Sequence, residues 1–87
     1  MISKTTSSFW KHLYDLGEND RQYAKKAYEL FIKDCAHPSL RFKKLAGHAD
    51  FWSVRVTLDI RAVAQRDGDT VTWFWIGPHK EFDQLFS

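Results

Sequence analysis

Eight residues in the middle of the chain, Phe51-Trp52-Ser53-Val54-Arg55-Val56-Thr57-Leu58, decide which class of fold this sequence can adopt. Bulky apolar side chains alternate there with small, polar or charged ones, so one side of the segment carries Trp52, Val54, Val56 and Leu58. A period of two predicts a β-strand with one buried face. Because successive side chains point to opposite faces of a sheet, Arg55 is expected on the face away from the apolar set.

Further strands are predicted on the C-terminal side of this segment. Turn residues interrupt the pattern at positions 47–50, 59 and 67–69, which leaves strands over residues 61–65 and 70–76. The short connections between them favour antiparallel pairing. Strict alternation in the last strand puts Trp73 and Trp75 on one side and Phe74 and Ile76 on the other, and one of the two pairs is expected in the core.

Two helices are predicted before the strands. The first can be capped by Ser7 or Ser8 and is expected to stop at Gly17 in the left-handed conformation. The second should begin near residues 19–20 and end around residues 35–36, because the residue before Pro38 is disfavoured in helical geometry. Its apolar residues follow the i, i+3, i+4, i+7 spacing of an amphipathic helix, at Ala24, Ala27, Tyr28 and Phe31.

The predicted fold class is therefore α+β, with two N-terminal helices packed on one face of a three- to four-stranded antiparallel sheet and a short C-terminal helical turn after Gly77-Pro78. Helices on one face leave the other face bare, and that bare face is the expected binding surface. A chain of 87 residues is too short to enclose a second large core, so residues 1–87 are expected to form a single domain.

Composition limits the classes of protein that this chain can be. Hydrophobic residues make up 44% and aromatic residues 16%, which is enough to bury a core. The single cysteine, Cys35, excludes an internal disulfide and a cysteine-rich zinc cluster, and it fits a reducing compartment. Residues 1–8 are polar, and no run of about eighteen apolar residues occurs. A cytoplasmic protein is expected, with neither secretion nor membrane spanning.

Positive charge is concentrated in the middle third of the chain. Residues 41–66 hold six Lys and Arg against two Asp, whereas residues 67–87 hold one Lys against four acidic residues. The basic segment indicates an anionic partner, and an ordinary solvated face is the alternative interpretation. The four histidines are scattered without metal-ligand spacing, so no metal or other cofactor is expected.

Four segments, taken in order and at their spacings, point to a known family. They are His37-Pro38-Ser39-Leu40-Arg41-Phe42-Lys43-Lys44-Leu45, Trp52-Ser53-Val54-Arg55-Val56, Ile60-Arg61-Ala62-Val63 and Trp73-Phe74-Trp75-Ile76-Gly77-Pro78-His79. Preceded by two helices, they resemble the RelE/ParE superfamily of toxins over nearly the whole chain. The resemblance implies two helices on a curved antiparallel sheet and a cognate antitoxin that wraps the toxin. It also implies one of two activities, because many members of the RelE branch cleave messenger RNA in the ribosomal decoding site without a metal ion, whereas the ParE branch poisons DNA gyrase.

RNA cleavage of this kind uses the neighbouring 2′-hydroxyl as nucleophile, so the protein must move protons and stabilise charge on the phosphate. Arginine suits the second task because its planar fork stays charged and can grip two oxygens. Arg55 and Arg61 occupy positions where similar RNA-cleaving toxins have basic residues. His79 follows the last strand, where the family often has an acid/base or phosphate-binding side chain. The alternatives are surface arginines paired with a carboxylate such as Asp59, and a histidine that only caps a helix.

A second set of residues is predicted to bind RNA rather than to cleave it. Arg41, Lys43, Lys44 and Lys80 could contact the phosphate backbone, and Trp75 could stack on an exposed base. In a regular strand Arg41 and Lys43 would lie on one face and Lys44 on the other, so these three cations cannot all line one surface. A solvated sheet edge is the alternative for the cations, and a core or antitoxin-covered position is the alternative for the tryptophan.

Three positions depart from the pattern of active relatives. Ser53 stands where some have lysine, Ile60 where an aromatic residue often precedes the arginine, and Phe82 where a tyrosine can serve, so each loses a functional group. Proton transfer would then fall on the histidine after the last strand or on a carboxylate such as Glu81 or Asp83. The leading hypothesis is a ribosome-dependent mRNA endonuclease. A gyrase inhibitor and a catalytically degenerate antitoxin-binding member are the alternatives.

Overall fold

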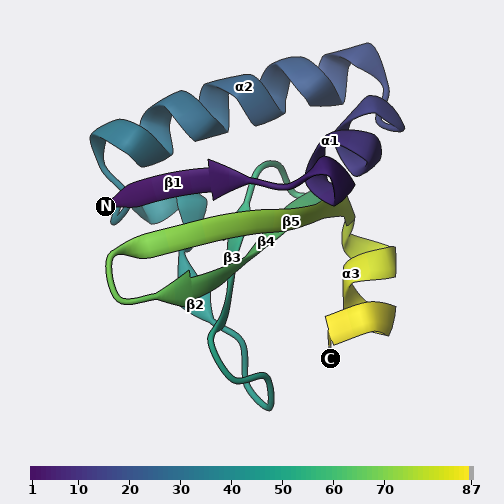
Figure 1. Cartoon of the computed structure of the whole chain (residues 1–87). Coiled ribbons are helices and arrows are strands. Elements are labelled where there is room, and N and C mark those ends of the chain that lie inside the picture. Colours follow the sequence, from purple (N-terminus) through teal and green to yellow (C-terminus); the bar gives the residue numbers. More distant parts are fainter. Residues whose placement is uncertain (87) are drawn as a thin grey trace.

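Five strands form one sheet in the spatial order β1-β5-β4-β3-β2 (Figure 1). The computed structural model describes residues 1–86, and its elements follow the chain as β1 (Ile2–Thr5), α1 (Ser7–Tyr14), α2 (Glu18–Lys33), the 3₁₀ turn η1 (Pro38–Leu40), β2 (Lys43–Lys44), β3 (Phe51–Arg55), β4 (Ile60–Asp67), β5 (Thr70–Pro78) and α3 (His79–Phe86). Neighbouring strands are antiparallel except for β1, which runs parallel to β5. The α+β class is confirmed, and the sheet is mixed and five-stranded where an antiparallel sheet of three or four strands was predicted.

The additional strand is β1, which the hydrophobic pattern did not reveal. Three of its four residues are exposed, and the one half-buried side chain is that of Ser3. The Ser3 hydroxyl oxygen accepts hydrogen bonds from Trp73 Nε1 at 3.0 Å and from the Tyr28 hydroxyl at 3.1 Å. Backbone pairing with residues 70–73 of β5 and these polar contacts hold the strand in place. A strand held in this way needs no apolar alternation in its sequence.

The N-terminal helices begin and end close to the predicted residues, with two corrections. Thr6 caps α1 in place of Ser7 or Ser8, since its hydroxyl oxygen accepts a hydrogen bond from the Phe9 backbone nitrogen at 3.1 Å. Gly17 lies directly before α2 with φ −64°, so the predicted left-handed stop at this glycine is wrong. The second helix ends at Lys33, slightly before the predicted end.

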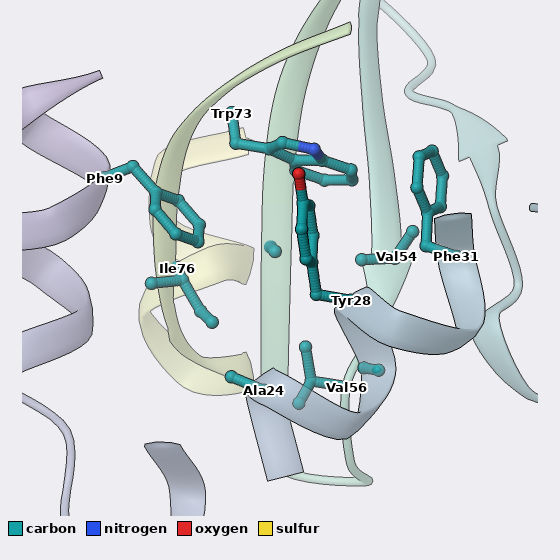
Figure 2. A pocket seen from close by; sticks show the side chains of 10 residues that line it. Phe9, Ala24, Tyr28, Phe31, Val54, Val56, Trp73 and Ile76 are labelled. Atoms are coloured by element: carbon teal, nitrogen blue, oxygen red, sulfur yellow. The ribbon is translucent and has the colours of Figure 1, made fainter. Parts of the chain in front are cut away.

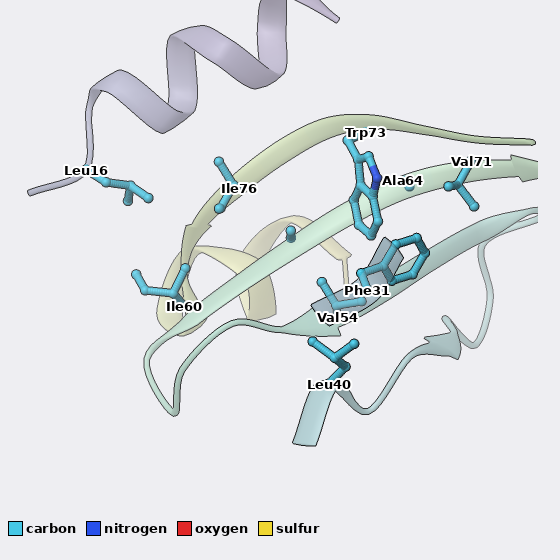
Figure 3. Packing of buried hydrophobic residues seen from close by; sticks show 10 residues of the cluster. Leu16, Phe31, Leu40, Val54, Ile60, Ala64, Val71, Trp73 and Ile76 are labelled. Atoms are coloured by element: carbon cyan, nitrogen blue, oxygen red, sulfur yellow. The ribbon is translucent and has the colours of Figure 1, made fainter. Parts of the chain in front are cut away.

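The first hydrophobic core lies between α1, α2 and the sheet (Figure 3). Phe31 of α2 meets Trp73 of β5 edge to face, with ring centroids 5.3 Å apart, and this contact joins the long helix to the centre of the sheet. The buried members of the core are Leu16, Phe31, Leu40, Val54, Ile60, Ala62, Ala64, Val71, Trp73 and Ile76. The predicted packing of both N-terminal helices on one sheet face is thus confirmed.

A small gap remains in this core beneath α2 (Figure 2). Its volume is about 30 Å³, and its walls are almost wholly apolar, with Phe9, Ala24, Val56 and Ile76 among them. A void of this size and polarity offers almost no hydrogen-bond partners to a ligand or to water. The gap is therefore a small packing defect beneath the small side chains of α2 and not a binding site.

A β-bulge in β5 changes which side chains share a face. Val63 pairs with Trp75 and Ala64 pairs with Trp73, so Phe74 is an extra residue between two ladder positions. Trp73 consequently belongs to the first core, whereas Trp75 packs on the opposite face of the sheet. The prediction that both tryptophans lie on one side is wrong, because it assumed an unbroken alternation.

The opposite face of the sheet, predicted to be bare, is partly covered by α3. This segment is an eight-residue helix rather than a short turn, and it contributes Phe82 and Phe86, whose rings lie 6.3 and 5.4 Å from that of Trp75. Together they form a second hydrophobic cluster, in which Leu45, Val63 and Trp75 are buried and Phe51, Phe74, Phe82 and Phe86 pack against them. The prediction of a wholly bare face is therefore wrong, and its uncovered part lies beyond this cluster.

The observed bounds of β3 and β4, which lie beside the uncovered part of this face, also differ from the predicted ones. β3 ends at Arg55, and Leu58 is 75% exposed in the hairpin that follows, so its predicted place beside Trp52 and Val54 is wrong. β4 begins at Ile60, one residue earlier than predicted, and runs further at its other end. The β3–β4 hairpin therefore lies at residues 56–59, directly after one predicted catalytic arginine and just before the other.

Candidate functional site

Arg55 and Arg61 face each other across β3 and β4, as the pair nearest the hairpin in this ladder. The ladder also pairs Ser53 with Val63, which belongs to the second cluster, so both arginines project from the sheet face away from α1 and α2. Both side chains are half-buried. Like charges directly opposite each other on a sheet are destabilising. An anion that bridges the two guanidinium groups would relieve this repulsion.

The backbone of the hairpin holds the Arg61 guanidinium. Its Nη1 donates hydrogen bonds to the carbonyl oxygens of Thr57 at 2.6 Å, Leu58 at 3.2 Å and Ile60 at 3.2 Å. All three bonds use one nitrogen, and the fork of an arginine has further N–H donors on its other nitrogens. The hairpin thus fixes the side chain while the remaining donors can serve a ligand.

Two other arginines and two carboxylates set the electrostatics around the Arg61 side chain. Burial and the positive charge of Arg55 lower the pKa of Arg61, and Arg41 lowers it further, whereas Asp83 and Asp59 raise it. Each of these four groups is therefore close enough to act on the Arg61 guanidinium through its charge. An arginine side chain stays protonated in proteins. The cluster consequently presents an excess of positive charge at one end of the sheet.

His79 lies at the same end of the sheet as Arg61. The β4–β5 ladder pairs Arg61 with Gly77, two residues before the histidine. The backbone N–H of His79 then donates to the carbonyl oxygen of Asp59 in the β3–β4 hairpin, at 2.6 Å. This bond ties the start of α3 to the hairpin that holds the arginine.

The imidazole of His79 also has a side-chain partner in its own helix. Its Nε2 lies 3.3 Å from Oδ1 of Asp83, one turn further along α3, and 44% of the histidine side chain is exposed. The same Asp83 acts on Arg61 through its charge. Asp83 therefore contacts the histidine and acts through its charge on the arginine at the same end of the sheet.

Two of the predicted RNA-binding lysines lie on opposite faces of the sheet edge. Lys43 pairs with Ser53 and so shares the face of Arg55, whereas Lys44 pairs with Trp52 and points to the side of the first core. Lys44 therefore does not line the surface that holds the two arginines, which agrees with the opposite faces that strand parity predicts for these two lysines. Lys43 remains a candidate.

The other two basic candidates frame the site from outside the strands. Arg41 follows η1 in the left-handed conformation, with φ 47° and ψ 47°, so the strand parity assumed for it does not apply. Its charge nevertheless acts on Arg61. Lys80 is exposed on the first turn of α3, next to His79. Both remain candidates for contacts to a phosphate backbone.

Trp75 is not available for base stacking. It is only 5% exposed, and Phe82 and Phe86 of α3 lie against its ring. The predicted stacking role of Trp75 is therefore wrong, because the β-bulge turns this indole toward α3 and the helix then covers it. The alternative interpretation, a core position, is the one that the structure bears out.

Asp83 is the residue of this site that sequence reasoning undervalued. It was considered only as a substitute proton carrier. Its i, i+4 spacing from His79 can be read directly in the sequence. That spacing has meaning only if residues 79–86 are helical, and only a short turn was predicted there.

The chemistry of the cluster is that of cations and a proton carrier. Across residues 1–86, no three His, Cys, Asp or Glu side chains gather in a group that could hold a metal ion. In the same part of the chain, every helix is too short or too polar to cross a bilayer. The arginines can bind a phosphate group, and an imidazole is the side chain most often used for proton transfer.

A family model for the ParE-like toxin domain matches residues 20–84. The matched segment includes all but the first two residues of α2, the four strands β2 to β5 and every residue of the cluster described above. No curated protein sequence matches the chain.

Several solved structures share the fold. A chain of the RelB–RelE antitoxin–toxin complex from Methanococcus jannaschii has a TM-score of 0.76 at 19% identity, over 97% of this chain and 99% of that one. YafQ from E. coli has a TM-score of 0.73 at 12% identity, over 92% and 94% of the two chains. A YoeB/ParE toxin from Agrobacterium tumefaciens has a TM-score of 0.68 at 18% identity, over 91% and 99%. At these identities the similarity establishes the fold and not the roles of individual residues.

Proposed function

Because this chain belongs to the ParE-like toxin family of the RelE/ParE superfamily, we propose that it is the toxin of a toxin–antitoxin pair and cleaves messenger RNA on the ribosome. The proposed reaction takes place in the cytoplasm and uses no metal ion. One observation carries the proposal. Arg55 and Arg61 face each other on neighbouring strands, and His79 is tied by its backbone to the hairpin between them.

The two arginines bind the scissile phosphate in this mechanism. Arg61 is held by the hairpin carbonyls and Arg55 lies directly across from it, so a phosphate group between them meets two preorganised cations. The 2′-hydroxyl oxygen attacks the phosphorus, negative charge grows on the non-bridging oxygens, and the bond to the 5′-oxygen breaks. Charge-assisted hydrogen bonds from both guanidinium groups stabilise that growing charge.

His79 moves the proton in the same step. As a neutral imidazole it accepts the proton of the attacking 2′-hydroxyl, and as an imidazolium it donates a proton to the leaving 5′-oxygen. Such a group typically contributes about a hundred- to ten-thousand-fold to the rate. The exposed 44% of the side chain gives a substrate access to the ring. The products are a 2′,3′-cyclic phosphate and a free 5′-hydroxyl.

The proposed partner is a cognate antitoxin. The RelB–RelE complex from Methanococcus jannaschii is a complex of an antitoxin with its toxin, and this chain shares the fold of that structure at 19% identity. By analogy, an antitoxin that wraps this chain would cover the positive end of the sheet and block access to RNA.

A gyrase-inhibiting toxin is the second candidate, and two observations favour it. Ser53 is only 3% exposed, and the half-buried Phe82 packs on Trp75, so the positions at which some active relatives have a lysine and a tyrosine here hold packed side chains without those functional groups. A protein that inhibits gyrase needs a complementary surface and no proton carrier. A catalytically degenerate antitoxin-binding member is the third possibility.

Induction of the chain without antitoxin tests the three candidates together. Transcript 5′ ends are mapped and gyrase supercoiling is assayed in the same cells, for the wild type and for Arg61→Ala, His79→Ala and Lys26→Ala. Lys26 is an exposed cation on α2, far from the cluster in the fold, and its variant serves as the control.

The nuclease proposal expects new transcript ends in the wild type and in Lys26→Ala, and none in the other two variants. The circular dichroism spectrum should be unchanged in all four proteins. Lost supercoiling with intact transcripts would replace the nuclease by the gyrase inhibitor. Growth at the normal rate would leave only the degenerate member.

A further inference from the structure

Within residues 1–86, Asp83 is the carboxylate side chain that contacts the proposed proton carrier and also acts through its charge on the proposed phosphate-binding arginine. Its Oδ1 lies 3.3 Å from Nε2 of His79. A carboxylate only accepts hydrogen bonds, so a hydrogen bond across this contact has Nε2 as its donor. The other ring nitrogen, Nδ1, is then the atom that carries the lone pair of a neutral imidazole.

Three contacts fix the helix on which this pair lies. The His79 backbone N–H donates to the carbonyl oxygen of Asp59 at 2.6 Å. On the same helix, Phe82 and Phe86 pack against Trp75 in the second cluster. Because α3 is attached both at its first residue and through its apolar side, the carboxylate one turn after the histidine has a defined place relative to the sheet.

The link to Arg61 separates this pair from an ordinary surface pair on a helix. Exposed ion pairs at i, i+4 usually contribute little to stability and have no further role. Here the carboxylate also opposes the lowering of the Arg61 pKa by burial and by Arg55. One negative group from α3 thus acts through its charge on a cation of β4 and contacts an imidazole of its own helix, at the end of the sheet where the reaction is proposed.

From this geometry we infer that Asp83 is a positioning residue, which holds His79 with Nε2 bound to the carboxylate so that Nδ1 exchanges the proton with the RNA. The inference rests on the proposed function and adds to it an assignment of the reacting nitrogen. It follows the general rule that the partner of one imidazole nitrogen sets the tautomer and the orientation of the ring. Asp83 itself neither touches the substrate nor takes up the proton.

Two measurements on the full-length chain test this role. The first is the ¹H–¹⁵N correlation spectrum of the histidine rings, which reports the tautomer and is assigned with His79→Asn. The second is cleavage of a ribosome-bound messenger RNA, with kcat and KM determined separately. The variants are Asp83→Asn, Asp83→Glu and, as a control with the same change in charge, Asp67→Asn at the far end of β4.

The wild type and Asp67→Asn should show His79 protonated on Nε2 in its neutral form. Asp83→Asn should mix the two tautomers and lower kcat by about 10- to 100-fold, at or below the typical contribution of the proton carrier itself. Its KM should change little, because the arginines that bind the phosphate remain. Asp83→Glu keeps the carboxylate on a longer side chain and should recover part of the loss.

The possible failures are distinguishable. A wild-type chain that cleaves RNA together with an Asp83→Asn variant of unchanged kcat and tautomer overturns the positioning role alone. An Asp83→Asn variant that cleaves faster overturns it as well, since the carboxylate would then only repel the phosphate. A wild-type chain that leaves ribosome-bound RNA whole overturns the proposed function, and the positioning role falls with it even where the hydrogen bond is seen.

Discussion

Gly77 and Trp75 are packed so closely that a Cβ atom on the glycine would lie 2.7 Å from Cζ2 and 2.9 Å from Cη2 of the indole. Gly77 is also the β5 residue that pairs with Arg61. The glycine is therefore needed for space, not for an unusual backbone conformation. This contact joins the second cluster to the strand pair that carries the candidate site.

Gly77→Ala should lower the free energy of unfolding by about 1–3 kcal/mol, because the added methyl group overpacks a site with a rigid indole on one side. The double variant Gly77→Ala, Trp75→Phe should recover part of this loss, since the smaller ring lacks the two atoms in conflict. Urea denaturation of both single variants and of the double variant measures the coupling between the residues. Strictly additive effects would contradict the contact.

Arginines on the two faces of the sheet should affect stability with opposite signs. Arg55 faces Arg61, so Arg55→Gln removes a like-charge pair and should raise the free energy of unfolding by about 0.2–1 kcal/mol. The guanidinium carbon of Arg66 lies 4.5 Å from the ring centroid of Trp52. Arg66→Gln removes this cation–π contact and should lower the free energy of unfolding by about 0.5–1 kcal/mol. Thermal unfolding at low salt measures the change in stability that each substitution causes. Equal effects of the same sign would show that cross-strand repulsion does not matter here.

The sequence alone supports the class of fold, the two helices and the side of the sheet from which Arg55 projects. These features depend on periodicity, which burial on one face imposes. The faces predicted for Trp73 and Trp75 are wrong because one extra residue, Phe74, reverses the alternation of side chains along β5. The local amino-acid composition does not reveal a β-bulge. The strand at Ile2–Thr5 was missed for a different reason, since its half-buried side chain, Ser3, is polar.

The residues of the candidate site could be predicted only in part from the sequence. Arg55, Arg61 and His79 could be proposed from a family resemblance and strand parity, and the structure brings them to one end of the sheet. The covering of Trp75 depends on how α3 docks, which is a tertiary contact with no signature in the local sequence. The partnership of Asp83 with His79 depends on the same helix.

Docking of α3 should be necessary for activity although its aromatic residues touch no substrate. Phe86→Ala should lower the free energy of unfolding by about 2 kcal/mol, somewhat less than for a fully buried phenylalanine. It should also reduce RNA cleavage, because His79 loses its fixed place. Leu85→Ala removes a side chain that is 58% exposed on the same helix and should leave both quantities nearly unchanged. The two variants are compared by urea denaturation and by cleavage of ribosome-bound RNA.

Neighbouring lysines of β2 should differ in their effect on RNA affinity. Lys43 shares the face of the paired arginines and Lys44 does not. Lys43→Ala should weaken binding to a single-stranded RNA and reduce the slope of log K against log salt by about 0.7, the value for one lost contact to a single strand. Lys44→Ala should leave the slope unchanged. Fluorescence anisotropy over a salt series measures both, and the reverse order would place the RNA on the other face.

The parallel pairing of β1 with β5 determines when the sheet can finish folding during synthesis. Ile2 pairs with Thr70 and Thr5 with Trp73, so β1 must wait for a strand that is synthesised after β2, β3 and β4. Contacts this far apart in the chain form late in folding. A nascent chain therefore lacks a finished sheet until β5, the last of the described strands, has emerged, and β1 stays without its partner strand until then.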